Sequence, residues 1–357
     1  MKYNQVEPHI DKKDVESVSE YLNSGGWVTE HGLTKKFEEK IKNTVNRKFA
    51  VAVPNGTIAI YLSLLAAGIG KGKRVAIPNI TMIATINAAL WADACPVLVD
   101  VDETLCMSYE ELVKNKNLDA VLFVPLNGRA GDGKKINDWC KKNNIKFIED
   151  SAHALGSSYG SDKCGSLGDL SIFSFTPHKI ITMGQGGMVL TDNEEYFEQL
   201  TDLKTFNRST DKIDWHKGFG LNFKITDLQA ALGLSQFEKL DKFIDNKRAI
   251  YKNYQENISN ENIELMKFKS EEVPWFFDIK VKTVEYKNHL IEELTKQGIE
   301  TRNVYPALSL QNYLKDYRHD ELQYSENIFD KLLWIPSSNS LSSKDVEKIS
   351  SVINSVG

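Results

Sequence analysis

The chain has 357 residues, of which 41% are hydrophobic and 26% are charged, so it can bury a large core in one or two domains. Its 44 Lys and Arg residues against 49 Asp and Glu residues give a net charge of −5, without a dense basic block, which argues against a nucleic-acid partner. The amino terminus is polar, and no apolar run approaches the roughly 18 residues of a membrane helix. We therefore expect a cytoplasmic protein without a membrane segment.

Two helices are expected first, over residues 10–24 and 33–46, with a loop from Gly25 to Thr29 between them. Seven short runs rich in β-branched or aromatic residues then predict strands, several of them separated by helical patterns. The alternation predicts an α/β domain with helices on both faces of its sheet. The predicted strands are Phe49–Val53, Arg74–Pro78, Pro96–Val101, Ala120–Pro125, Lys146–Asp150, Leu170–Phe175 and Met188–Thr191.

From Thr226 to about Glu256 the apolar spacing predicts one long helix that could bridge to a second domain. The remainder is expected to form a small α+β unit, with a strand over residues 275–281 and helices over residues 287–297 and 344–353. We place the large domain at residues 1–240 and the small domain at residues 241–357.

The four cysteines are scattered along the chain and form no Cys-x-x-Cys pair. This spacing predicts neither a zinc site nor a disulfide framework. We expect reduced, mostly buried thiols and no metal. The four are Cys95, Cys106, Cys140 and Cys164.

Lys179 lies between a strand-like run ending in Phe-Ser-Phe and the glycine-rich segment Gly184-Gln185-Gly186-Gly187. Most lysines are solvated surface residues, but few of those stand between a strand and such a turn. A desolvated lysine here can form an imine with an aldehyde cofactor such as pyridoxal phosphate (PLP), and can move protons at the substrate carbon. The glycines fit a plain turn equally well, and we interpret them as architectural.

Asp150 ends a predicted strand, and open α/β sheets place ligand groups at the carboxyl ends of strands. A carboxylate there can hold the pyridine nitrogen of PLP protonated, although an acid after a strand can also cap the next helix. Lys179 in the same region makes us favour the cofactor role. His153 could lie beside the cofactor ring or could be a structural histidine.

A phosphate site is predicted where Asn55-Gly56-Thr57 follows a strand and opens a helix. Free backbone N–H groups and the positive end of the helix favour a dianion, and the Thr57 hydroxyl adds a donor. Ser174 is a natural second hydroxyl donor. Asn-Gly is also common in ordinary turns, so this motif is weak by itself.

Taken together, the motifs resemble the DegT/DnrJ/EryC1/StrS family of PLP-dependent nucleotide-sugar aminotransferases over nearly the whole chain. The resemblance implies the aspartate aminotransferase-like fold (type I), with a mixed, mostly parallel seven-stranded sheet and a smaller α+β C-terminal domain. The segments that carry it are Gly25–Phe37, Asn55–Ala59, Ile77–Asn87, Glu149–Gly156, Phe173–Gly187, Gly220–Ala231 and Leu332–Leu341.

Carried over residue by residue, the resemblance implies that Lys179 binds the cofactor covalently and that Asp150 pairs with its ring nitrogen. Phosphate contacts would come from Gly56, Thr57 and Ser174, and His153 would contact the hydroxyl side of the ring. Asn222 matches a residue that reaches the phosphate from the neighbouring subunit, which implies a homodimer with shared sites.

Several positions depart from the family pattern. Met82 stands where an aromatic residue usually stacks on the ring, and methionine packs on a π face less rigidly. Asn127 replaces a frequent Tyr, Gln185 the usual Glu, and Lys224 a frequent Arg, and a His common near Tyr305 is missing. These changes bear on the substrate, whose recognition we expect near Trp27, Thr29, His178, Arg302 and Tyr305.

The resemblance implies a ping-pong reaction in which L-glutamate gives its amino group to PLP, which then aminates a keto sugar linked to a nucleoside diphosphate. Amination at C4 of a 4-keto-6-deoxyhexose, as in perosamine or viosamine formation for surface polysaccharides such as O-antigen, fits best. The nucleotide stays open between GDP, UDP and dTDP.

Three alternatives remain at this stage. The sugar could be aminated at C3 rather than C4. The chain could be a PLP-dependent sugar dehydratase, in which His replaces the lysine; His178 is adjacent, but Lys179 is the fifth residue after Ser174, which favours transamination. It could also be a PLP-binding sensor without turnover, which the intact Lys179, Asp150 and Thr57 argue against.

Overall fold

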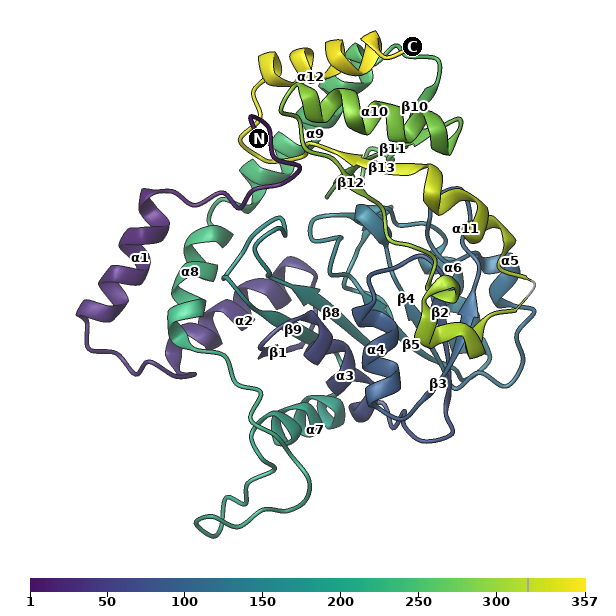
Figure 1. Cartoon of the computed structure of the whole chain (residues 1–357). Coiled ribbons are helices and arrows are strands. Elements are labelled where there is room, and N and C mark those ends of the chain that lie inside the picture. The colour runs from purple at the N-terminus through teal and green to yellow at the C-terminus, as the bar shows by residue number, and fades with distance from the viewer. Residues whose placement is uncertain (320) are drawn as a thin grey trace.

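The computed structural model describes residues 1–319 and 321–357. These residues form a large sheet and a smaller sheet, each packed against helices, and a short two-stranded sheet (Figure 1). Within the same residues, no helix combines the length and the apolar character needed to cross a bilayer.

The large sheet has seven strands in the order β1-β9-β8-β5-β4-β2-β3. Strand β9 runs antiparallel to both of its neighbours, and the pairs from β8 to β3 are parallel. The predicted mixed, mostly parallel, seven-stranded sheet is therefore confirmed. In chain order the strands are β1 (Phe49–Val53), β2 (Arg74–Pro78), β3 (Cys95–Val99), β4 (Ala120–Phe123), β5 (Lys146–Asp150), β8 (Leu170–Ser174) and β9 (Gly187–Thr191).

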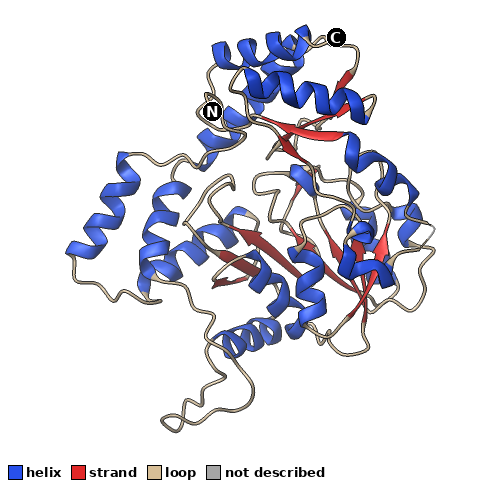
Figure 2. Cartoon of the chain, in the orientation of Figure 1, coloured by secondary structure: helices blue, strands red, loops and turns tan. Residues whose placement is uncertain are grey.

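Successive side chains of each strand enter two separate cores, one on each face of the sheet. In β4, for example, Val121 and Phe123 belong to one core, and Ala120 and Leu122 belong to the other. Figure 2 shows helices on both sides of the strands, as predicted. The first core takes residues from α2 (Gly32–Thr44), α5 (Tyr109–Leu112) and α6 (Gly133–Lys142), and the second from α3 (Gly56–Ala66), α4 (Ala84–Trp91) and α7 (Glu194–Lys204).

The prediction of one long helix from Thr226 to Glu256 is wrong, because the chain turns there between α8 (Asp227–Phe237) and α9 (Leu240–Asn257). At the turn, the Lys239 ammonium lies 2.6 Å from a carboxylate oxygen of Asp14 and 3.1 Å from one of Asp11. Both acids lie at the start of α1 (Lys12–Asn23), so these bonds stabilise the turn.

The smaller sheet is antiparallel, in the order β10-β11-β13-β12. Its core includes residues of α9, α10 (Val284–Lys296) and α12 (Ser343–Ser355), and also Tyr3, which pairs with Ile299. The domain boundary at residue 240 stays a prediction. The remaining elements are β6 (Ser158–Tyr159), β7 (Asp162–Lys163), β10 (Ile263–Leu265), β11 (Phe277–Val281), β12 (Arg302–Asn303), α11 (Gln323–Ile328) and β13 (Leu332–Ile335).

A buried ion pair links the two sheets. Arg129, in the loop after β4, bonds to Asp278 on β11 through two of its guanidinium nitrogens, and both side chains are almost completely buried. Asn127 donates a 2.7 Å hydrogen bond to the same carboxylate. The pair fixes the β4 loop against the small sheet.

The amino terminus of α2 is capped from another helix. Its own N-cap residue, His31, makes no side-chain cap bond. Instead, the Asp227 carboxylate accepts hydrogen bonds from the backbone N–H groups of His31, Leu33 and Thr34 at 2.8 to 2.9 Å. A carboxylate at this end of a helix is favoured by the helix dipole, and here it also fixes the end of the loop that carries Trp27.

Candidate active site

Three strands of the large sheet bring the predicted site residues together at the sheet's edge. Strand β1 leads into α3 at Gly56, β5 ends in Asp150, and β8 ends in Ser174. A pocket of about 330 Å³ opens between these strand ends and residues that lie in or next to the smaller sheet. Its lining includes ten predicted residues: Gly56, Thr57, Met82, Asp150, His153, Ser174, His178, Lys179, Arg302 and Tyr305.

One end of the pocket is built to hold an anion. The Asn55 side chain caps α3 by accepting a 3.0 Å hydrogen bond from the Ile58 N–H, and the helix opens with its first residues at the pocket. A Cβ atom on Gly56 would lie 3.1 Å from the Ser174 Cβ, and one on Gly187 would lie 2.4 Å from the Asn55 carbonyl oxygen. Glycine at these positions therefore allows the helix terminus and the β8–β9 strand ends to approach closely, with the hydroxyls of Thr57 and Ser174 nearby.

Asp150 supplies the buried carboxylate of the pocket. It accepts a 2.9 Å hydrogen bond from the Thr85 hydroxyl and a 3.3 Å bond from the Ala152 N–H. Burial raises the pKa of Asp150, and the Thr85 bond, the Ala152 bond and the charge of Lys179 oppose that rise. An acid in this state can hold a cationic ring nitrogen by charge.

Lys179 follows β8 in a loop, and its partly buried side chain faces the same pocket. Burial lowers the pKa of Lys179 to about 7, with Arg302 acting in the same direction and Asp150 opposing it. A large fraction of this amine is therefore neutral near pH 7, which is the form that attacks an aldehyde. This lowered pKa is the property that the sequence predicted for Lys179.

His153 is a buried residue of the pocket wall, where its ring stacks on Trp275 with centroids 3.9 Å apart. Burial, with the charges of Lys179 and His178, lowers the pKa of His153 well below its usual value. Its Nδ1 atom accepts a 3.5 Å hydrogen bond from the Asn127 N–H. His153 is therefore a neutral, fixed ring at neutral pH.

The remaining pocket residues lie around its opening. Met82, His178 and Arg302 are exposed, and Tyr305 is partly buried next to Trp334. Burial raises the pKa of Tyr305, so its hydroxyl stays protonated. Arg302 places a positive charge where a negatively charged group of a substrate could bind.

Three predicted residues lie away from the pocket of this chain. Trp27 is 67% exposed, on a loop whose backbone accepts a 2.5 Å hydrogen bond from the Tyr21 hydroxyl. The Thr29 carbonyl lies 3.4 Å from the Asp227 N–H, and Asn222 is exposed on the long connection between α7 and α8. That connection extends away from the body of the molecule (Figure 1). The predicted roles of all three in binding ligands stay predictions.

Among the pocket residues that sequence reasoning missed, Thr85 and Trp275 contact predicted site residues. Thr85 lies in an apolar helix and bonds to Asp150 across 65 positions, so nothing local marks it. Trp275 lies in an aromatic run that indicates a strand, yet its ring is 4.0 Å from the Lys179 ammonium. Both contacts arise only once the sheet is assembled.

The pocket fits PLP on the chemistry of its own residues. It combines an amine with a lowered pKa, a buried carboxylate, and a helix terminus that glycines leave open for a phosphate. Such a combination on a mixed α/β sheet defines an enzyme of the PLP-dependent class. The sequence pattern of the DegT/DnrJ/EryC1/StrS aminotransferase family matches residues 8–354, so the chain belongs to this family and is an aminotransferase that depends on PLP.

Individual relatives agree with this assignment. The chain is 36% identical to GDP-perosamine synthase of Escherichia coli O157:H7 over 364 residues, which cover 99% of this chain and 98% of that protein. It is 32% identical to GDP-perosamine synthase of Vibrio cholerae over 317 residues, 86% of each chain. The solved aminotransferase TlmJ from Streptoalloteichus hindustanus superposes with a TM-score of 0.92 at 25% identity, over 99% of this chain and 98% of that one. The predicted family and fold are confirmed.

Proposed function

We propose that this enzyme transfers the amino group of L-glutamate to C4 of a nucleotide-linked 4-keto-6-deoxyhexose, giving a 4-amino-4,6-dideoxy sugar nucleotide. The observation that carries the proposal is Lys179, with its lowered pKa, in one pocket with the buried Asp150. The similarity to two GDP-perosamine synthases supports a sugar nucleotide as the acceptor.

When bound, PLP supplies an aldehyde that accepts the amino group and a ring that withdraws electrons from the reacting carbon. Lys179 would bond to the aldehyde and, when released from it, would move protons at the reacting carbon. A positioned general acid or base typically contributes about 10² to 10⁴ in rate. Asp150 would keep the ring nitrogen protonated, because its charge favours a cation at that atom.

The other pocket residues would hold the cofactor and the substrate in place. Gly56, Thr57 and Ser174 would bind the phosphate at the start of α3, and His153 would lie beside the ring hydroxyl. Arg302 would attract the diphosphate of the sugar nucleotide at the opening of the pocket.

We also propose that the active unit is a homodimer in which Asn222 of each subunit reaches the phosphate site of the other. Asn222 lies outside the pocket of its own chain, on the connection that extends from the molecule. The same connection exposes the apolar side chains of Ile213, Trp215 and Phe219, which a second subunit could cover.

The test is to incubate the PLP-loaded enzyme with L-glutamate and 4-keto-6-deoxyhexoses linked to GDP, UDP or dTDP. We expect 2-oxoglutarate in equal amount to a product whose mass and NMR spectrum show an amine at C4. Lys179→Ala should lack the visible band of bound PLP and should be inactive, whereas Lys287→Ala, which removes a buried lysine of α10, should keep both properties.

Other products would decide between the alternatives. An amine at C3 would replace the proposed position, and a deoxy sugar without nitrogen would identify a dehydratase. No 2-oxoglutarate with any acceptor would indicate a protein that binds PLP without turnover.

A further inference from the structure

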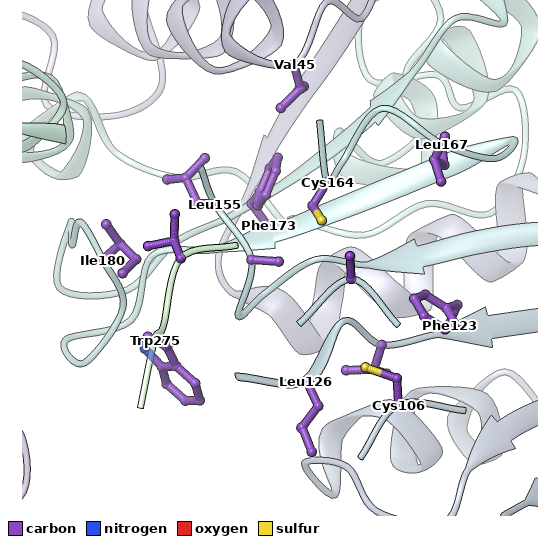
Figure 3. Packing of buried hydrophobic residues seen from close by; sticks show 14 of the residues in the cluster. Val45, Cys106, Phe123, Leu126, Leu155, Cys164, Leu167, Phe173, Ile180 and Trp275 are labelled. Carbon is purple, nitrogen blue, oxygen red and sulfur yellow. The ribbon is translucent and has the colours of Figure 1, made fainter. Parts of the chain in front are cut away.

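Trp275 contacts Lys179 and its neighbours His178 and His153. It precedes β11 of the small sheet, and its side chain is 2% exposed. Figure 3 shows it at the margin of the buried cluster, on the side where Ile180 and Leu155 lie. Its ring stacks on the rings of His153 and Phe276, with centroids 3.9 Å and 3.7 Å away.

The indole group also fixes the backbone of the loop that carries Lys179. The Trp275 Nε1–H donates a 2.7 Å hydrogen bond to the carbonyl oxygen of His178, which belongs to the peptide bond that joins His178 to Lys179. The Lys179 ammonium lies 4.0 Å from the ring centroid, within the range of a cation–π contact. One side chain therefore contacts both the backbone and the amine of the lysine.

Lys247 holds the backbone of Trp275. Its ammonium, on the buried face of α9, donates a 2.8 Å hydrogen bond to the Trp275 carbonyl oxygen and another bond to the carbonyl oxygen of Ser337. Among the described residues no carboxylate pairs with it, although the side chain is almost fully buried. Burial lowers the pKa of Lys247 to about 7, and in its charged or its neutral form the buried amine needs the two carbonyl partners to satisfy its N–H groups.

We propose that Trp275 is a positioning residue that fixes the backbone and amine of Lys179 through the bond to His178, and that Lys247 acts on the lysine by holding Trp275 in place. The inference rests on the proposed function, because it assigns Lys179 the covalent role. It adds a series of contacts that runs from Lys247 on α9, through Trp275 before β11, to the loop that carries Lys179.

The alternative is that Trp275 only fills space in the core and that Lys247 only makes buried hydrogen bonds there, without any effect on Lys179. Both are buried, so either substitution lowers stability under each explanation. Only positioning predicts a change in the geometry of the bound cofactor and a loss in kcat at unchanged KM for L-glutamate, since a misplaced amine slows the chemistry without changing donor binding.

The test uses the PLP-loaded full chain and three variants. Trp275→Phe keeps an aromatic ring on His153 and removes the indole N–H, Lys247→Met removes the ammonium, and Lys247→Arg keeps a donor. Trp139→Phe and Lys287→Met serve as matched controls, because they change a tryptophan of α6 and a buried lysine of α10 outside the pocket. Each variant is measured for thermal unfolding, visible circular dichroism per bound PLP, and the kinetics of the half-reaction with L-glutamate.

We expect Trp275→Phe to lower the half-reaction rate about tenfold, as a small displacement of a catalytic group does, and to weaken the visible circular dichroism band. Lys247→Met should do the same to a smaller extent, and Lys247→Arg should recover part of the loss. The double variant Trp275→Phe with Lys247→Met should resemble Trp275→Phe alone, because the two residues act in series.

The proposal is overturned if Trp275→Phe has the dichroism and half-reaction rate of the wild type, or if the effects of the two substitutions multiply. It is also overturned if the controls give the same losses. Because dichroism and the glutamate half-reaction require no sugar, a failure to aminate any sugar nucleotide would reject the acceptor proposed above and leave this inference standing.

Discussion

The hydroxyl group of Thr85 on α4 donates a 2.9 Å hydrogen bond to the carboxylate of Asp150 at the end of β5. The Thr81 hydroxyl lies 3.2 Å from that of Thr85, so the acid is held by a short series of hydroxyl groups. The bond favours the charged form of an acid whose pKa burial raises. Thr85 therefore contributes to the charge that the proposed function requires of Asp150.

Replacing Thr85 by Val should raise the pKa of Asp150 further, because the group that lowers it is removed. The carboxylate would then be protonated at a higher pH, and the acidic limb of the kcat/KM profile should move upward by about one pH unit, the size expected of a hydrogen bond to a charged group. Thr85→Ser keeps the hydroxyl and should follow the wild-type profile. If the pH profiles of Thr85→Val and the wild type superimpose, the Thr85 bond does not control the pKa of Asp150.

The lowered pKa of Lys179 predicts how the apoprotein takes up its cofactor. Only the neutral amine reacts with the aldehyde, so the rate of appearance of the visible PLP band should rise with pH to a midpoint near 7, as the pKa of about 7 requires. An ordinary lysine would give a midpoint at about 10.4. A midpoint in that range would contradict the predicted environment of Lys179.

Replacing Arg302 gives a second test of the lowered pKa of Lys179. Its positive charge lowers the pKa of Lys179, so Arg302→Met should move the midpoint of cofactor uptake upward. Because Arg302 is exposed and screened by solvent, we expect a shift below about one pH unit. Arg318→Met, which changes an arginine outside the pocket, is the control, and a downward shift in Arg302→Met would refute the assignment.

Shared sites predict complementation between two inactive variants. Asn222→Asp would place a negative charge next to the partner's phosphate site, and Lys179→Ala removes the reacting amine. In a hybrid dimer one of the two sites has both residues intact, so an equal mixture should recover about a quarter of wild-type activity after subunit exchange. Activity should be absent before mixing, and no recovery despite demonstrated exchange would count against a site that uses Asn222 from the partner.

The ion pair between Arg129 and Asp278 predicts a large change in stability. Arg129→Met leaves a buried carboxylate without its partner, which typically costs about 3 to 5 kcal/mol. Lys280→Met on the same strand removes an exposed pair with Glu264 and should cost at most about 1 kcal/mol. Urea unfolding of both variants measures the difference, and equal free energies of unfolding would show that the buried pair is not a major link between the sheets.

Most of the fold was predictable because its signals are local. The seven strands of the large sheet are short apolar runs, and the two cores follow from the alternation of side chains along them. The break between α8 and α9 was missed because the sequence there has neither Gly nor Pro. The position of the break depends on the contact between Lys239 and the acidic residues at the start of α1. Lys239 and Asp14, for example, are 225 positions apart in the sequence.

The candidate site was predictable where its residues form motifs next to strand ends. Asp150 ends a strand and Gly56 and Lys179 follow strands, so their common edge could be inferred. Trp275 could not be inferred, because its bond to His178 joins residues 97 positions apart and its own segment indicates only a strand. The role proposed for Asn222 comes from the family resemblance alone and stays a prediction.

The hydrogen bonds between Asp227 and the start of α2 have a consequence for folding during synthesis. Among the residues that the structure describes, strand β1 pairs only with β9. Helix α2 needs a carboxylate that follows it by about 190 residues, as the bond from Thr34 to Asp227 shows with a separation of 193. A ribosome therefore delivers the first fifty residues long before their partners emerge. During synthesis this early segment stays exposed to chaperones, because the large sheet can close only after β9 has emerged, and α2 gains its cap only after residue 227.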